Sequence, residues 1–121
     1  MNGRILVVED QEDNRKIMRD LLTNADYEVI EAVTGDEGVA MAKIHVPDLI
    51  LMDIQLPGLD GYEATRRIKA DSVLHYIPII AVTSYALSGD EDKAREAGCD
   101  AYFSKPVNAR ALLAKVRKYT A

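Results

Sequence analysis

Five short apolar runs alternate with five helix-prone segments along this 121-residue chain. The runs are RILVVE (4–9), YEVIEA (27–32), LILMD (49–53), IPIIAVT (77–83) and AYFS (101–104). Their lengths are typical of β-strands. Helix-like spacing of apolar residues follows four of them, and a polar, helix-prone segment follows the fourth run. Such regular alternation predicts parallel strands joined by right-handed crossovers, with helices covering both faces of one sheet.

The intervening segments carry the apolar stripes of amphipathic helices. These stripes are formed by Ile17, Met18, Leu21, Leu22 and Ala25, by Val39, Ala40 and Ile44, by Ala64 and Ile68, and by Ala109, Leu112, Leu113 and Val116. The third helix is expected to start at Asp60 or Gly61, and the polar segment LSGDEDKAREAG (87–98) predicts a fourth that stops at its final glycine. No Pro-, Gly- or Ser-rich linker interrupts the pattern, so we expect one doubly wound α/β domain over residues 1–121.

Composition narrows the class of protein. The net charge of -5 argues against binding to nucleic acid or to anionic membranes, both of which favour a basic surface. The single cysteine, Cys99, permits no disulfide within the chain, and its apolar context favours a small buried residue over a thiol catalyst. Neither a targeting peptide nor an apolar stretch of membrane-spanning length is present, so a cytoplasmic protein is expected.

Polar groups follow the ends of several predicted strands. Glu9 and Asp10 follow the first strand, Asp53 ends the third, Thr83 ends the fourth and Lys105 follows the fifth. In an open parallel sheet, ligands bind at the carboxyl ends of the strands. Each residue alone has an ordinary explanation, such as a helix cap for Asp10. Together they predict one shared site.

Three carboxylates in one place are costly unless a cation joins them. Two unit charges about 4 Å apart interact by roughly 4 kcal/mol at an effective dielectric of about 20. A divalent ion with hard oxygen ligands, best Mg²⁺, would relieve this repulsion. With Lys105 alongside, the site has the parts for phosphoryl transfer to a carboxylate nucleophile. Asp53 is the candidate nucleophile, because a stiff buried strand limits its motion.

Four motifs resemble those of the receiver domains of two-component response regulators. They are VVEDQ (7–11), DLILMDIQLPGLDGYE (48–63), IIAVTSYA (79–86) and AYFSKP (101–106), and the resemblance covers the whole chain. The sequence is most similar to stand-alone receivers of alphaproteobacterial cell-cycle and polarity control and to receivers of hybrid kinases. The resemblance implies a flavodoxin-like (βα)5 fold with strand order 2-1-3-4-5.

The resemblance also implies roles for individual residues. Asp53 matches the aspartate phosphorylated by a histidine kinase or histidine phosphotransfer protein. Asp10, Asp53 and the backbone carbonyl of Gln55 would bind Mg²⁺ directly, with Glu9 acting through a metal-bound water; Mn²⁺ could substitute. Lys105 would pair with the phosphoryl oxygens.

Other matching positions concern the switch. Thr83 would move toward the acyl phosphate and Tyr102 would turn inward behind it, changing the surface formed by the fourth helix, the fifth strand and the fifth helix. Pro106 would follow a cis peptide bond. Asn14 and Ile17 could dock the phosphodonor or could serve only helix packing.

Small departures from the family pattern leave the acyl-phosphate lifetime open. Glu9 replaces the commoner Asp, and Leu56 stands where Met often precedes the proline. By the resemblance, Gln55 lies where the family varies the rate of hydrolysis, and Tyr85 would border the attacking water and could slow it.

Three alternatives use the same architecture. A phosphatase of the haloacid dehalogenase type would need a second acid where Gln55 stands, and a flavin-binding module would need a phosphate loop unlike the acidic EDQEDN (9–14). A structural adaptor would have no reason to gather these charges. The favoured reading is a signalling domain, not an enzyme, with self-catalysed phosphorylation and dephosphorylation.

The chain stops shortly after its last predicted helix, so we expect output through a downstream protein target. A stand-alone receiver or phosphorelay intermediate fits, although a fragment of a hybrid kinase would have the same sequence. We expect a monomer or weak dimer that binds neither nucleic acid nor membrane.

Overall fold

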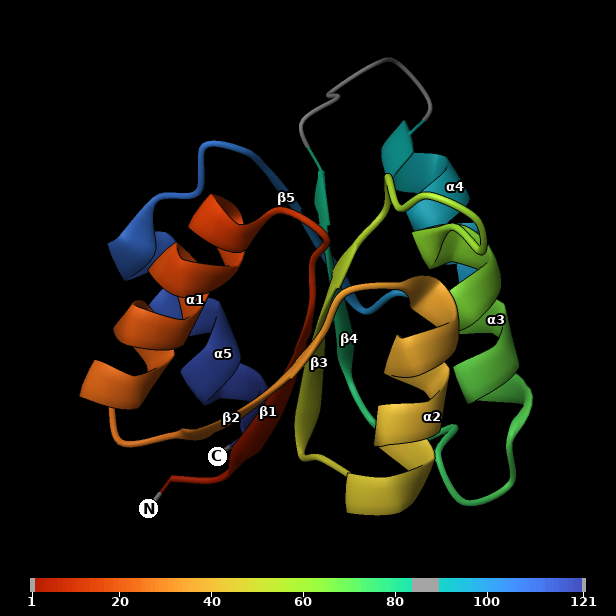
Figure 1. Ribbon diagram of the computed structural model, residues 1–121, viewed down its shortest axis with the longest axis horizontal. Helices are drawn as coiled ribbons and strands as arrows, with labels where there is room; N and C mark the ends of the chain where they lie inside the picture. The colour runs from red at the N-terminus through yellow and green to blue at the C-terminus, as the bar shows by residue number, and fades with distance from the viewer. Residues whose placement is uncertain (1, 84–89, 121) are drawn as a thin grey trace.

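Residues 2–83 and 90–120 are described in a computed structural model, in which helices cover both faces of a central sheet (Figure 1). The strands are β1 (Arg4–Val8), β2 (Glu28–Ala32), β3 (Leu49–Asp53), β4 (Ile79–Thr83) and β5 (Ala101–Ser104). The helices are α1 (Glu12–Asn24), α2 (Gly35–His45), α3 (Gly61–Ala70), α4 (Asp90–Ala97) and α5 (Ala109–Thr120). Each element coincides with a segment predicted from the sequence.

The five strands are parallel and follow the order β2-β1-β3-β4-β5, which confirms the predicted topology. Helices α1 and α5 cover one face, and α2, α3 and α4 cover the other (Figure 1). The strand order reverses around β1 and β3, which pair with Val8 opposite Met52. The residues that follow β1 therefore emerge beside Asp53, at the switch point where ligands bind in such sheets.

The central strands form the core. Strands β3 and β4 are buried throughout, as is β1 after Arg4, whereas the edge strands β2 and β5 are largely half-buried. Alternate residues of each central strand pack on opposite faces: Leu6 and Ile50 face one apolar cluster, Ile5 and Leu51 the other. Burial on both faces explains why these runs are almost continuously apolar.

The fully buried positions of helix α2 are small residues, while Val39 and Met41 pack against the core only in part. Val39, Ala40 and Ile44 correctly predicted a helix, but Ala40 is exposed and Ile44 is 69% exposed. The buried residues are Gly35, Gly38 and Ala42. The helix lies close to β1, where a Cβ atom on Gly38 would meet a methyl group of Val8 at 2.9 Å.

The helices range from 8 residues in α4 to 13 in α1. A helix that crosses a bilayer needs about 20 predominantly apolar residues. Within residues 2–83 and 90–120, none of the helices meets that requirement.

Candidate functional site

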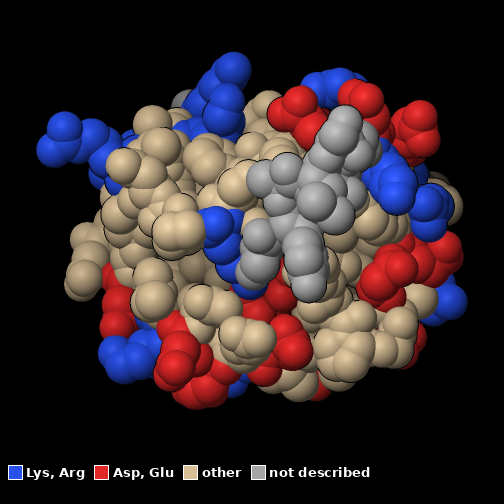
Figure 2. Space-filling view, turned by 90° about the horizontal axis from the view of Figure 1, so that it is seen from above, with Lys and Arg blue, Asp and Glu red and all other residues tan. Residues whose placement is uncertain are grey.

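The two loops at the switch point bring three carboxylates together. Glu9 and Asp10 follow β1, and Asp53 is the last residue of β3; each offers an oxygen within 4.8 Å of the others. Glu9 is fully buried, Asp53 is 5% exposed and Asp10 is exposed. Figure 2, which looks down on this end of the molecule, shows acidic and basic groups side by side near the middle of the face.

Lys105 reaches the acidic cluster from the loop after β5. Its Nζ lies 3.5 Å from Oδ2 of Asp53 and also donates to Oε1 of Glu9. The Lys105 backbone N–H donates to the carbonyl of Thr83 at 2.7 Å, which ties this loop to the end of β4. The Lys105–Pro106 peptide bond is cis. One ammonium group thus faces two carboxylates from different strands.

The side chain of Asp53 is also bound by the backbone of the loop that follows it. Its Oδ1 accepts the backbone N–H of Gln55 at 3.0 Å. The chain then folds back, so that the N–H of Gly61 donates to the carbonyl of Ile54 at 3.0 Å. Asp60 caps α3 by accepting the N–H of Glu63 at 2.9 Å, which confirms the predicted start of this helix.

The approach at Gly61 leaves no room for a side chain. A Cβ atom there would lie 2.3 Å from the Asp53 carbonyl oxygen and 2.6 Å from the Ile54 Cα. Gly61 therefore lets the end of β3 and the start of α3 touch, which the sequence did not reveal. In the sequence, the one sign of this close approach was a glycine at the start of the predicted helix.

Burial and repulsion act on Glu9 together. Burial raises the pKa of the Glu9 carboxyl group and the neighbouring Asp53 adds to the rise, while hydrogen bonds from Lys105 and from the Gln11 backbone oppose it. The capping explanation for Asp10 does not hold, because the N-cap of α1 is Gln11. Three carboxylate ligands, two of them buried, fit a divalent cation with hard-ligand preferences such as Mg²⁺.

Thr83 and Tyr102 lie on neighbouring strands. Thr83 is 2% exposed at the end of β4, one residue beyond the partner of Asp53 in the register. Tyr102 pairs with Ala81, is half-buried, and lines a cavity of about 190 Å³ beside α4. Tyr85 lies outside the described residues, as does Ser84.

One face of α1 borders the site. Asn14 and Ile17 line a cavity of about 120 Å³ together with Lys105 and Pro106. Ile17 is 64% exposed, although it belongs to the apolar stripe that predicted the helix. Both candidate docking residues therefore lie next to the lysine of the site.

Cys99 lies away from the acidic cluster, in the turn after α4. It is buried, and its Sγ lies 3.8 Å from Oγ1 of Thr65. Burial raises the pKa of the thiol to about 11. A protonated, enclosed thiol is a poor nucleophile, in agreement with a packing role.

Sequence reasoning also missed Arg15. Its side chain donates to the backbone carbonyl of Glu9 at 3.0 Å, directly behind the acidic pair. In the sequence it is one of several charged residues on α1, so no pattern distinguished it from a solvated helix position.

Comparisons with known proteins identify the family of the chain. Residues 5–117 match the response regulator receiver domain family. The chain is 44% identical, over 98% of its length and 97% of the relative's, to the polar-differentiation response regulator DivK of Brucella ovis.

Solved structures give the same result. The receiver domain of a sensor histidine kinase from Pseudomonas aeruginosa PAO1, solved with a magnesium ion in its active site cleft, has a TM-score of 0.91 and 36% identity, with 98% of this chain and 97% of that one covered. The chemotaxis protein CheY4 of Vibrio cholerae has a TM-score of 0.91 and 26% identity, with 97% and 98% covered. The chain belongs to the response regulator receiver domain family.

Proposed function

We propose that this receiver domain accepts a phosphoryl group on Asp53 from a phosphohistidine of a histidine kinase or histidine phosphotransfer protein. The supporting observation is the position of Asp53, whose Oδ2 lies 3.5 Å from Lys105 Nζ within a cluster of three carboxylates. A phosphatase function lacks such support, because the residue two positions after Asp53 is Gln55 and not a second acid.

In the proposed transfer, a carboxylate oxygen of Asp53 attacks the phosphorus atom, forming a P–O bond while the donor's P–N bond breaks. The electron pair of the P–N bond remains on the imidazole nitrogen of the donor. Lys105 then faces an acyl phosphate in place of a carboxylate, and its ammonium group pairs with the new oxygens. The reaction requires little covalent chemistry from the protein, so positioning and charge are its main contributions.

Glu9, Asp10 and Asp53 are the residues that would hold Mg²⁺, with the Gln55 carbonyl as a further ligand and a water between Glu9 and the ion. When bound, the ion supplies positive charge that neutralises the developing charge on the phosphoryl oxygens. Mn²⁺ prefers similar oxygen ligands and is expected to substitute.

Thr83 and Tyr102 are proposed to relay the modification. Phosphorylation adds negative charge and three acceptor oxygens at Asp53, which favours a rotamer of Thr83 that donates to them. Tyr102 would then enter the space that Thr83 leaves, altering the surface formed by α4, β5 and α5. A near-complete change of population needs about 5 kcal/mol of differential stabilisation.

The proposal is tested by incubating the protein with acetyl phosphate and Mg²⁺ and measuring the intact mass. We expect a gain of about 80 Da, the mass of one phosphoryl group replacing a proton. Chelating the metal should slow this gain by about 100-fold or more, because several kcal/mol of charge stabilisation is lost. A protein that stays unmodified with metal present, or that turns over phosphomonoesters, would contradict the proposal.

Asn14 and Ile17 are proposed to dock the phosphodonor beside Lys105. Replacing Ile17 by Asp should slow transfer from a phosphorylated donor by about 10-fold or more, the effect of losing about 1.4 kcal/mol of apolar contact and adding a charge. Transfer from acetyl phosphate should not change, because so small a donor needs no docking surface.

Ile44 provides the matched control for this measurement. It is 69% exposed against 64% for Ile17, but it lies at the far end of α2. Ile44→Asp should therefore leave both reactions unchanged. Equal slowing by the two variants would refute a specific role for the α1 surface.

A further inference from the structure

The Arg15 side chain connects three parts of the chain behind the acidic pair. Its Nη1 donates to the Glu9 carbonyl at 3.0 Å, with the Asp10 carbonyl at 3.5 Å. Its Nε donates to Oε1 of Glu31 at 3.1 Å, and its Nη2 pairs with Glu12. With only 12% of the side chain exposed, the guanidinium lies largely inside this network.

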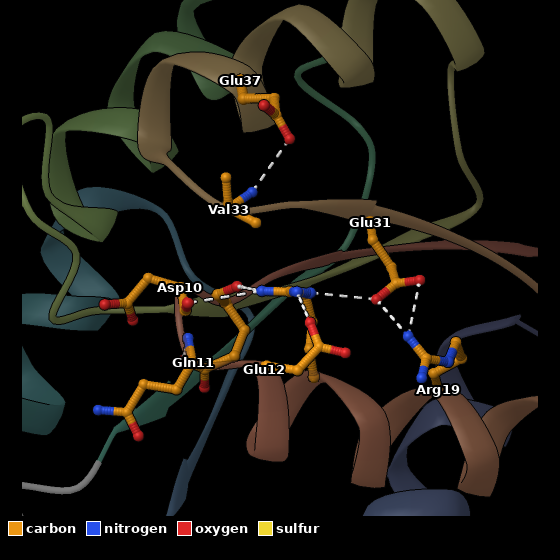
Figure 3. Close-up of polar contacts among 9 residues, drawn as sticks. Asp10, Gln11, Glu12, Arg19, Glu31, Val33 and Glu37 are labelled. Carbon is orange, nitrogen blue, oxygen red and sulfur yellow. Dashed lines mark hydrogen bonds and ion pairs between the residues drawn. The ribbon is translucent and has the colours of Figure 1, made fainter.

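Glu31 anchors the arrangement from the neighbouring strand. It lies on β2 opposite Val7 of β1, and it also pairs with Arg19 at 2.9 Å (Figure 3). Arg15 and Arg19 of α1 thus both bind the Glu31 carboxylate of β2. Arg15 also donates to the turn between β1 and α1. Through Arg15, the turn that carries Glu9 and Asp10 is therefore connected both to helix α1 and to strand β2.

These contacts of Arg15 oppose the electrostatic repulsion between the acids of the cluster. Glu9 and Asp10 are consecutive acids whose oxygens lie within 4.8 Å of each other and of Asp53. Their mutual repulsion favours any backbone movement that separates them. Hydrogen bonds from a charged donor to backbone carbonyls resist this movement without adding a ligand to the site.

We propose that Arg15 is a positioning residue, which holds the backbone of Glu9 and Asp10 so that both carboxylates stay within reach of one divalent ion. This role rests on the proposed function, because it presumes that the acidic cluster binds the ion. Residues that orient metal ligands without touching the metal typically affect affinity by about 10–100-fold.

The positioning role and the charge of Arg15 predict opposite changes in Mg²⁺ affinity when Arg15 is replaced, so the role can be tested. Arg15 is a cation near a cation site, so its removal should strengthen Mg²⁺ binding if only Coulomb interactions matter. If Arg15 positions the ligands, its removal should weaken binding. The two explanations cannot give the same result.

The test compares Arg15→Gln with Arg19→Gln. Both variants lose one positive charge and one ion pair with Glu31, and Arg15→Gln also loses its pair with the largely exposed Glu12. Among the contacts of the described residues, Arg19 does not share the carbonyls of Glu9 and Asp10. We expect Mg²⁺ affinity, measured by calorimetry at constant ionic strength, to fall about 10-fold or more in Arg15→Gln. Arg19→Gln should stay near the wild-type affinity.

A second readout needs no metal. Amide hydrogen exchange at Glu9 to Gln11 in the metal-free protein should be faster in Arg15→Gln than in Arg19→Gln. Unchanged or tighter Mg²⁺ binding by Arg15→Gln, equal weakening in both variants, or equal exchange would overturn the proposal. If the wild type itself fails to bind Mg²⁺, the proposed function fails, while the exchange measurement still tests the positioning.

Arg15→Lys covers the case in which Arg15→Gln does not fold. Lysine keeps the charge, but a single ammonium group cannot reproduce the fork that reaches Glu31 and the Glu9 carbonyl at once. This variant should therefore bind Mg²⁺ about 10-fold more weakly as well. Wild-type affinity in Arg15→Lys would overturn the proposal, because Mg²⁺ binding would then not depend on the two-armed contact of the guanidinium.

Discussion

Asp53→Asn is expected to remove phosphorylation by acetyl phosphate and by a phosphohistidine donor completely. The amide keeps the shape of the side chain but has no anionic oxygen to attack phosphorus. Glu9 and Asp10 should not replace it, because they follow β1, whereas the acceptor position is the last residue of β3. Intact-mass measurement should show no gain of about 80 Da in the variant.

The same variant should lose the stabilisation that Mg²⁺ gives to the folded state. At a metal concentration about ten times the dissociation constant, binding adds about 1.4 kcal/mol to the free energy of unfolding. Asp53→Asn should show much less of this gain in thermal melts, since one of the three clustered carboxylates is absent.

Asp36→Asn is a suitable control for both measurements. It makes the same chemical change at a side chain that is 75% exposed on α2. It should be phosphorylated and stabilised by Mg²⁺ like the wild type. A mass gain in Asp53→Asn at the wild-type rate would show that another residue is the acceptor.

Gly61→Ala should disrupt the contact between the end of β3 and the start of α3. The new Cβ atom would lie 2.3 Å from the Asp53 carbonyl oxygen, so either the end of β3 or the start of α3 must move. Overpacking of this kind typically costs about 1–3 kcal/mol. Alanine favours helices over glycine by about 1 kcal/mol, so a net loss of stability would mean that the steric cost exceeds this gain. The free energy of unfolding from urea titrations gives the value.

Phosphorylation should also slow in Gly61→Ala, because the displaced backbone carries the acceptor Asp53. Gly58→Ala separates this effect from stability. Gly58 has a φ of +72°, and no described heavy atom lies within 4 Å of the position its Cβ would occupy. Its substitution should cost about 1–2 kcal/mol in backbone strain and leave the phosphorylation rate of the folded protein unchanged. Equal slowing in the two variants would exclude the contact at Gly61 as the cause.

Local patterns were sufficient to predict the elements of the fold. Strands such as β3 are buried on both faces, so their sequences are continuous apolar runs with clear ends. The candidate site was also visible in outline, since parallel strands deliver their carboxyl ends to one edge of the sheet. For this reason Glu9, Asp10, Asp53 and Lys105 could be grouped before any distance was known.

The contacts of the helices were less predictable than their positions, because a stripe of apolar residues at helical spacing does not show which surface the stripe will contact. Ile17 and Ile44 have the spacing of core residues, yet both are largely exposed. Helix α2 instead approaches β1 through Gly38 and Ala42, whose small size reflects packing distance and not hydrophobicity. Arg15 was missed for a related reason, because its partners Glu9 and Glu31 come from two strands.

By itself, the sequence determined the alternation of strands and helices and the set of charged residues at one edge of the sheet, because both depend on short-range patterns. The tertiary structure alone decided how those charges meet. Lys105 contacts Asp53 and Glu9 from 52 and 96 residues away, and of the two consecutive acids Glu9 is buried while Asp10 is exposed. Contacts over such separations depend on how whole elements pack, and no local pattern encodes them.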